Sequence, residues 1–322
     1  MMGTFSARSV QLRARKLSTV QRLRRFLSNG AVQVCEWYAP TTQALLLAGG
    51  SGGQVRLIMD STKVNGGQRL IMVSVGYRRR RVPLAWTWAR GARGHCTTQV
   101  QVKLLRYVQG LLPLGVQVSV VGDCEYGNSL FIEYMDHWGL AYALRQPGDH
   151  LVMSKGDGQW QRIENLPLTI SETQWWGRVV LTRASAYPVN LILYWRHSEK
   201  AARYFTTSCL TLQSTLALYR RRMWIEEMFG DMKKHGFDHE ASHLRHFLRL
   251  SRLTLVVCLL YVWLIALGDY VLTHALSTEV DRPDCRDLSI FRLGWDFLER
   301  RLACCDPIPP VLIPNFCSVY GR

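Results

Sequence analysis

Two apolar segments that each end in an aspartate are the feature that most constrains the fold. "QVRLIMD" at 54–60 is typical of a short strand that ends at Asp60, and "VQVSVVGD" at 116–123 is typical of one that ends at Asp123. Residues 97–112 between them have the length and composition of a helix, and parallel strands need such a crossover. If the two strands are adjacent and parallel, their ends lie about 4.8 Å apart. The order therefore predicts an α/β fold that brings two carboxylates together.

This pair of carboxylates calls for a cation. Two aspartates at that distance repel one another unless a positive charge lies between them. Ligation by oxygen alone suits Mg²⁺ or Mn²⁺, which bind one or two carboxylates together with phosphate oxygens of a substrate. Two such ions stabilise the attacking and leaving oxygens of an in-line phosphoryl displacement. Taken singly, each aspartate is also a common turn residue or helix cap, so the interpretation depends on the whole set.

A third carboxylate lies in "LYRRRMWIEEMFGDMKKHGF" at 218–237, which reads as a helix. Glu226 can join the two aspartates there, whereas Glu227 lies further round the helix and is the weaker candidate. Helical geometry places four side chains in one narrow sector beside an apolar stripe: Tyr219, Arg222, Glu226 and Lys233. The alternative is a solvated helix face with chance ion pairs.

The charge balance indicates a polyanionic partner. Formal net charge is +16, from 40 Lys and Arg against 24 Asp and Glu, with a pI near 9.7. Such a surplus suggests nucleic acid or anionic lipid, with simple solubility as the alternative. Residues 7–30 predict a basic amphipathic helix or helix pair, and the first 30 residues hold seven basic side chains and no acid: Arg8, Arg13, Arg15, Lys16, Arg22, Arg24 and Arg25.

A second basic cluster marks a turn. Residues 68–77 and 82–88 read as strands that flank four consecutive arginines. This pattern predicts a β-hairpin whose basic tip presents Arg78, Arg79 and Arg80 to the polyanion.

The later segments are assigned by composition. Residues 140–210 hold short runs rich in Trp, Thr and Val between turns, which favour strands. From 211 to about 275 the sequence is typical of helices. Within it, residues 253–268 carry no charge. They fall short of the roughly 20 residues of a spanning helix, so we expect a buried helix, with a membrane anchor as the alternative.

Cysteine usage and the N-terminal residues bear on the compartment. The nine cysteines are widely and irregularly spaced without a C-x-x-C, which is typical of neither a zinc site nor a disulfide framework. Arginines interrupt the N-terminal residues, so the apolar core of a signal peptide is missing. We expect a reduced cytoplasmic compartment.

Taken together, these residues resemble a known family. The order Asp60, Asp123, Glu226, with the glutamate inside Y-x2-R-x3-E-x6-K, resembles the DDE transposases of bacterial insertion sequences, and most of all the insertion-sequence-four family. The resemblance spans roughly residues 20–300. It implies a ribonuclease-H-like core, in which a mixed β-sheet is flanked by helices. It also implies metal-dependent cleavage of transposon-end DNA, followed by attack of the freed 3′-OH on target DNA.

The resemblance also implies roles for single residues. Asp60, Asp123 and Glu226 would hold two Mg²⁺ ions, for which Mn²⁺ can substitute. Side chains that grip the phosphates of the DNA ends would be Tyr219, Arg222 and Lys233. In some relatives a tryptophan of the β-rich insertion stacks on a flipped base, for which Trp175 and Trp176 are the candidates. Adjacent residues of a strand point to opposite faces, so at most one can serve, and packing within the sheet is the alternative for both. A homodimer on DNA is expected.

The resemblance divides the chain into five parts and has two departures. The region before Asp60 is short, and the second motif, "GDCEYG", has Cys124 and Glu125 where an arginine or glycine is more usual. A decayed copy that binds DNA and acts as a repressor is therefore an alternative, and a basic membrane-associated protein is another. The expected parts are a basic helical DNA-binding region at 1–50, two core segments at 51–145 and 211–275, a β-rich insertion at 146–210, and a tail at 276–322.

Overall fold

The structure, a computed structural model, describes most of the chain: residues 16–64, 67–91, 96–154, 158–233, 236–282 and 287–316. The chain forms two compact units, Gly49–Phe229 and a second unit that combines Met1–Ala48 with Gly230–Arg322. Residues 7–15 of the expected basic helix lie outside the described residues, and with them Arg8, Arg13 and Arg15.

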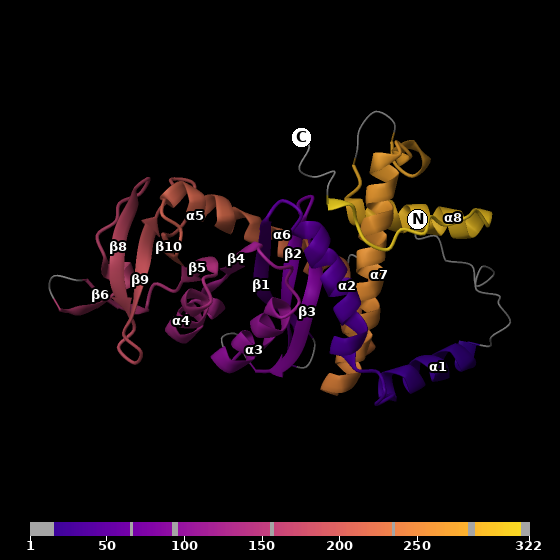
Figure 1. The fold of residues 1–322 in the computed structure, drawn as a ribbon, viewed down its shortest axis with the longest axis horizontal. Coiled ribbons are helices and arrows are strands. Elements are labelled where there is room, and N and C mark those ends of the chain that lie inside the picture. The colour runs from indigo at the N-terminus through magenta and orange to yellow at the C-terminus, as the bar shows by residue number, and fades with distance from the viewer. Residues whose placement is uncertain are drawn as a thin grey trace. The chain divides into compact units, whose positions relative to one another are not determined.

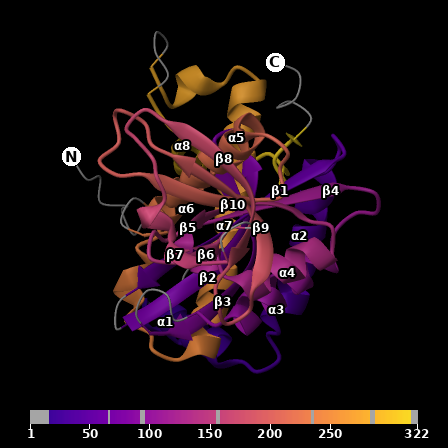
Figure 2. The ribbon, with the colours of Figure 1, turned by 90° about the vertical axis from the view of Figure 1, so that its left-hand side faces the viewer.

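The unit Gly49–Phe229 is built on one mixed sheet, in which the described residues form ten strands (Figures 1 and 2). In spatial order these are β3 (Arg80–Arg90), β2 (Gln68–Tyr77), β1 (Gln54–Val64), β4 (Gln117–Gly122), β5 (Ala141–Gln146), β10 (Arg203–Thr207), β9 (Tyr187–Tyr194), β8 (Thr173–Leu181), β6 (Leu151–Met153) and β7 (Trp160–Arg162).

The centre of the sheet has the ribonuclease-H-like arrangement. β1 runs parallel to β4 and β4 parallel to β5, while β2 is antiparallel to both β1 and β3. The central strands read as continuous apolar runs because both faces of a parallel sheet are covered, and Leu57, Ile58, Val120 and Val121 are fully buried. The predicted fold class, a mixed sheet flanked by helices, is confirmed.

Three helices cover this sheet. α3 (Thr98–Gln109) packs on β2 and β3 and is the crossover that leads from the hairpin to β4. α4 (Ser129–His137) packs on β5 and β9, and α5 (Leu212–Tyr219) on β4 and β5. In both views α5 lies on the side of the strands away from α3 and α4 (Figures 1 and 2). The helix predicted at 97–112 is confirmed, with slightly shorter bounds.

The β-rich stretch between β5 and α5 continues the central sheet. β10 pairs antiparallel with β5, and the ladder then runs through β9, β8, β6 and β7. Residues 146–210 therefore lengthen the sheet and close the open edge of β5 with a hydrogen-bonded partner.

One regular helix over 218–237 was expected, and that expectation is wrong. α5 ends at Tyr219, a 3₁₀ turn η4 (Arg220–Met223) follows, and α6 (Trp224–Met232) completes the segment. A physical reason lies in η4, where the Arg221 carbonyl accepts a hydrogen bond of 2.8 Å from the buried Arg81 guanidinium. A 3₁₀ stretch inside a helix often marks such a local demand.

The second unit is helical. Its helices are α1 (Lys16–Ser28), α2 (Val34–Gly49), α7 (Phe247–Thr273) and α8 (Ile290–Cys304). α7 and α8 cross closely because glycines meet there: a Cβ on Gly268 would lie 1.9 Å from the Ile290 carbonyl oxygen, and one on Gly294 1.9 Å from that of Leu264. Four short 3₁₀ turns complete the fold in the two units: η2 (Cys124–Tyr126), η3 (Ile163–Asn165), η5 (His239–Ser242) and η6 (Ser277–Glu279).

α7 contains the apolar segment that raised the membrane alternative. The helix has 27 residues and, among those the structure describes, is long and apolar enough to cross a membrane by length and composition. Two thirds of its most apolar window is buried within the structure (67%). The buried Arg252 near its start donates hydrogen bonds to the carbonyls of Leu27 and Val32, at 2.9 and 3.3 Å.

Candidate active site

The two aspartates come together at the centre of the sheet. The parallel register of β1 and β4 ends with Met59 opposite Gly122, so Asp60 and Asp123 follow at neighbouring positions. Both are buried, at 5% and 9% exposure. The predicted parallel pairing is confirmed. The expectation that the first strand stops at Asp60 is wrong, because β1 continues to Val64 along β2 and pairs Asp60 with Met72.

Backbone groups orient both carboxylates. Asp60 Oδ1 accepts a hydrogen bond of 2.7 Å from the backbone N–H of Ser61. Asp123 caps the turn η2, and its Oδ1 accepts a hydrogen bond of 3.0 Å from the backbone N–H of Glu125. Asp123 is therefore also a cap, which was its alternative role.

Arg222 connects the first aspartate to Glu226. Its Nη1 lies 2.6 Å from Asp60 Oδ2, and its Nη2 lies 2.9 Å from Glu226 Oε1. The Glu226 side chain is half exposed, whereas that of Arg222 is largely buried. The 3₁₀ turn η4 thus places a guanidinium between two carboxylates that come from residues 166 positions apart in the sequence (226 − 60).

Electrostatics couple all three acids. Burial is the main cause that raises the pKa of Asp60, and the negative charges of Asp123 and Glu226 add to it; because Arg222 and the Ser61 N–H offset only part of this effect, the pKa reaches about 7. Burial lowers the pKa of Arg222, but Asp60, Tyr219, Glu226 and Asp123 together bring it above its usual value. The site concentrates negative charge in a place where water cannot screen it.

The donor set fits a hard divalent cation in its chemistry. Asp60, Asp123 and Glu226 offer carboxylate oxygens, which Mg²⁺ and Mn²⁺ prefer. Burial, and then the nearby acids, raise the pKa of Asp60 and so disfavour its ionised form, which a bound cation would stabilise. In the described part of the chain, however, no three His, Cys, Asp or Glu side chains converge closely enough to hold a metal. Arg222 supplies the positive charge between Asp60 and Glu226 in this arrangement.

The other residues of the predicted row have different surroundings. Tyr219 is buried, with its ring 4.7 Å from that of Phe205, and burial raises the pKa of its phenol. Lys233 follows the end of α6 and belongs to the second compact unit. Glu227 pairs with Arg80 at 3.2 Å.

The arginine run forms the predicted hairpin tip, but its four side chains have different surroundings. Arg78 and Arg79 have φ of 41° and 64° and make the two-residue turn between β2 and β3, with Arg79 exposed. Both φ values are positive, as in a type I′ hairpin turn. Arg80 pairs with Glu227.

Arg81, the fourth arginine of the run, is 1% exposed and cannot meet a polyanion. It donates to the carbonyls of Arg56 and Arg221 and lies 5.3 Å from the ring of Trp224. Burial, together with the charges of Arg221 and Arg56, lowers its pKa to about 9.

The two candidate tryptophans lie at a β-bulge. Trp175 pairs with Ile192 and Gly177 with Leu191, so Trp176 is the extra residue in β8. The expectation that adjacent tryptophans alternate between faces assumed a regular strand, which the bulge interrupts. Trp175 is 42% exposed, whereas Trp176 Nε1 donates a hydrogen bond of 2.7 Å to Gln174.

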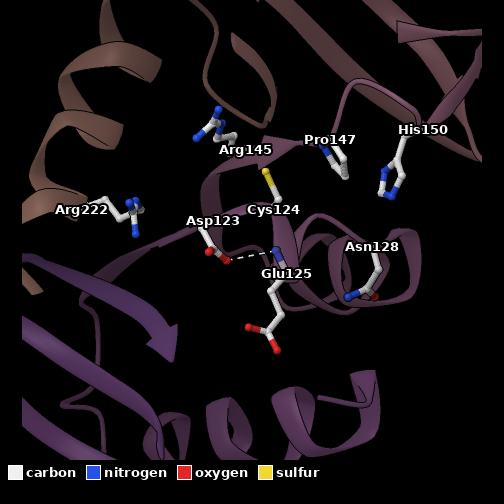
Figure 3. A pocket seen from close by; sticks show the side chains of 8 residues that line it. All are labelled: Asp123, Cys124, Glu125, Asn128, Arg145, Pro147, His150 and Arg222. Atoms are coloured by element: carbon white, nitrogen blue, oxygen red, sulfur yellow. Dashed lines mark hydrogen bonds between the residues drawn. The ribbon is translucent and has the colours of Figure 1, made fainter. Parts of the chain in front are cut away.

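A pocket of about 590 Å³ opens beside Asp123 (Figure 3). Figure 3 shows Arg222 directed toward Asp123, and Arg145 beside Cys124. The positive charges of Arg222 and Arg145 both act to lower the pKa of the Tyr219 phenol, against the larger effect of burial. The pocket is lined by Asp123, Cys124, Glu125, Asn128, Arg145, Pro147, His150 and Arg222.

Sequence reasoning missed Arg145 and His150. A signal for Arg145 was present in "AYALRQ" (141–146), where the arginine follows a run of apolar, mostly buried residues in a central strand. A charge in such a strand needs a reason.

Comparison with known proteins decides the family. Residues 52–263, more than half of the chain, match the transposase DDE domain. The chain belongs to the transposase DDE domain family. The matched segment contains Asp60, Asp123 and Glu226. A search of the curated proteins finds no match.

Among solved structures, this chain is similar to the piggyBac transposase, determined as a synaptic complex with hairpin DNA. The identity is 10% and the TM-score 0.40, over 80% of this chain and 55% of the other. The chain thus spans about half the length of that transposase.

Proposed function

We propose that this DDE transposase cuts transposon-end DNA and joins the freed 3′ end to target DNA, with Asp60, Asp123 and Glu226 as its catalytic carboxylates. One observation carries the proposal. Two buried aspartates lie side by side on parallel strands, and Arg222 links one of them to Glu226. Burying that much negative charge has no benefit for the fold, because it disfavours the ionised form of Asp60. A chemical role explains it.

Mg²⁺ is the proposed cofactor, with Mn²⁺ as a substitute and two ions per site. Asp60, Asp123 and Glu226 would hold the ions, and these supply charge stabilisation to the attacking and leaving oxygens of the phosphodiester. Glu226 is the mobile partner in this scheme, since its side chain is half exposed whereas both aspartates are fixed by backbone N–H groups.

Arg222 is the proposed phosphate clamp. Its two terminal nitrogens bind Asp60 and Glu226 separately, and the same fork binds a phosphate through two parallel hydrogen bonds. With Tyr219 and Lys233 it completes the Y-R-E-K signature of the insertion-sequence-four family, to which we assign the chain. The buried Tyr219 would act by holding Arg222 in place, because its phenol lies close enough to affect the pKa of that guanidinium.

DNA is the proposed partner, bound as a homodimer that joins two ends. Contacts to its phosphates would come from the hairpin tip, with Arg78, Arg79 and Arg80, and from Arg145 in the pocket. Trp175, the more exposed tryptophan of the bulge, is the candidate for stacking on a base. We place the protein in the cytoplasm at the nucleoid and, since most of α7 is buried, outside the membrane.

The test is a strand-transfer assay with Mg²⁺ on DNA that carries the candidate terminal repeats. Wild type should nick the ends and form joined product, and Glu226→Gln should lose at least about 100-fold in rate because one oxygen ligand is replaced by an amide. The matched control is Glu227→Gln, the neighbouring acid, which pairs with Arg80 instead of Arg222. It should keep its rate within a factor of about 3, as a surface change should.

Two results would defeat the catalytic assignment. One is equal activity of wild type and Glu226→Gln, and the other is product that forms equally well in EDTA.

A DNA-binding derivative that represses an active relative is the second candidate. Two observations favour it: Arg222 lies between two of the acids, and the described residues hold no converged three-ligand cluster. In that case the wild type would show no nicking, and a variant with alanine at Asp60, Asp123 and Glu226 would bind the same DNA with unchanged affinity.

A further inference from the structure

The two catalytic aspartates are tied to each other through the residues that orient them. Ser61 donates its backbone N–H to Asp60, and Glu125 donates its backbone N–H to Asp123. The side chains of these same two residues meet, since Ser61 Oγ donates to Glu125 Oε2 at 2.8 Å. A chain of three hydrogen bonds therefore leads from one carboxylate to the other, through a contact between residues 64 positions apart in the sequence.

Arg69 in β2 secures this connection. Its Nη2 lies 2.7 Å from Glu125 Oε2 and also donates to Ser61 Oγ. The side chains of Arg69 and Glu125 are only 5% and 4% exposed. Three elements, β1, β2 and the turn η2, are held at one point.

The turn that carries Glu125 is fixed from its other side. Gln101, fully buried in α3, donates a hydrogen bond of 3.0 Å to the Glu125 carbonyl and accepts one of 3.0 Å from Asn128. The backbone N–H that holds Asp123 therefore has little freedom to move.

Stability alone does not account for this ion pair. Burying two charges is unfavourable unless every polar atom finds a partner, and the buried Glu125 Oε1 has no hydrogen-bond partner among the described residues. A less strained packing would use apolar side chains here. Nor is Glu125 a free ligand, because its other oxygen already accepts from Ser61 and Arg69.

We propose that Ser61, Arg69 and Glu125 form a positioning clamp that fixes the spacing of Asp60 and Asp123 for divalent-cation binding. The clamp acts through its backbone N–H groups and does not itself touch the cation. This inference rests on the proposed function, since it assigns the clamp to the same carboxylates.

The experiment measures Mn²⁺ binding to the full chain by calorimetry without DNA, beside the rate of end cleavage and the affinity for end DNA. Ser61→Ala removes the hydroxyl and keeps the N–H. It should weaken Mn²⁺ binding and slow cleavage about 10- to 100-fold, as the loss of an outer-shell partner does, while DNA affinity stays unchanged. Ser61→Thr restores the hydroxyl and should recover both values.

Ser74→Ala is the matched control. Ser74 is a fully buried serine on β2 whose hydroxyl bonds the Ile58 carbonyl of β1, two residues before Asp60, but it takes no part in the clamp. It should bind Mn²⁺ as wild type does.

A second pair of variants covers the case in which one change perturbs the fold. Glu125→Leu, which removes the acceptor, and the double variant Ser61→Ala/Glu125→Leu should lose similar amounts of Mn²⁺ affinity, because both break the same contact and their effects do not add.

Equal Mn²⁺ affinity in wild type, Ser61→Ala and Ser74→Ala would overturn the clamp and leave the proposed function standing. Equal losses in Ser61→Ala and Ser74→Ala would overturn it too, since the effect would then be one of packing. A wild type that neither binds Mn²⁺ nor cleaves would overturn the proposed function, and the clamp with it.

Discussion

At the scale of single residues, the environment of Asp60 disfavours its ionised form and so makes stability depend on pH. It is 5% exposed, and burial with two other acids nearby raises its pKa to about 7 even though Arg222 lies 2.6 Å away. The folded protein therefore holds a proton there that the unfolded chain releases near pH 4. Stability without metal falls as pH rises from about 4 to about 7, and stays low above that.

Asp60→Asn should stabilise the metal-free protein at pH 8, by up to about 4 kcal/mol if the whole pKa shift is realised. At about pH 3 it should change little, because the carboxyl is then mostly protonated in both states. Urea unfolding in EDTA at the two pH values measures the difference. The exposed Glu227→Gln should shift stability by less than about 0.5 kcal/mol at either pH. The same gain for Asp60→Asn at both values would show that charge is not the cause.

The position of Arg145 leads to a second prediction at the residue scale, which concerns the binding of DNA. It lines the pocket beside Asp123 and Cys124, near the buried Tyr219. Arg145→Gln should weaken binding of end DNA and reduce the slope of log affinity against log salt by about 1, as the loss of one phosphate contact does. Fluorescence anisotropy across a salt series measures both. An unchanged slope would place Arg145 outside the DNA interface.

At the scale of elements, short irregular segments set the geometry. The 3₁₀ turn η4 breaks what looked like one helix, yet it keeps Arg222 and Glu226 four residues apart and paired. The hairpin tip is a second irregular segment, since Arg78 and Arg79 adopt left-handed backbone conformations that glycine or asparagine usually takes. The tip therefore carries two arginines at positions where the backbone conformation disfavours most side chains.

Arg79→Gly should therefore raise stability by about 1 kcal/mol, because a non-glycine residue in this region is strained by about 1–2 kcal/mol. The same variant should weaken DNA binding, because the exposed cation is gone. Arg79→Ala separates the two effects: it should bind DNA as weakly as Arg79→Gly while gaining no stability. Chemical unfolding and DNA titration of both variants provide the check. A gain in stability without any loss of binding would leave the tip without a role on DNA.

At the scale of the whole molecule, the charge of +16 should govern the proposed association with DNA. Neutralised phosphates release counterions, so affinity depends steeply on salt. Binding to any long duplex should fall on the order of 10³-fold between about 50 and 200 mM salt, if about six phosphates are contacted. A filter-binding series on unrelated DNA tests this prediction, and a flat profile would contradict the polyanion interpretation.

The sequence predicted those parts of the fold whose signals are local. The apolar runs that end in Asp60 and Asp123, with a helix between them, predicted the parallel pair at the centre of the sheet. The hairpin followed from two strand-like runs around the arginines. Contacts between distant residues could not be predicted, because nothing near Arg69 indicates a partner 56 positions away.

The burial of Arg81 could not be predicted from the sequence for the same reason. Its partners are the backbone carbonyls of Arg56 and Arg221, and because every residue has a carbonyl, the sequence does not indicate which ones accept a hydrogen bond. A helical wheel likewise assumed regular geometry over 218–237, and so could not show that the 3₁₀ turn η4 interrupts the helix between Tyr219 and Trp224.

The ladder from β5 through β10 to β7 makes residues 146–210 structurally indispensable. Removing them would take β10 away from β5 and leave the backbone groups of that edge open to other chains, which is a template for aggregation. A trimmed version of this protein would therefore need a new strand or a covering loop at that margin before it could stay in solution. Relatives that differ in this region should accordingly vary in its length and loops while retaining a strand beside β5.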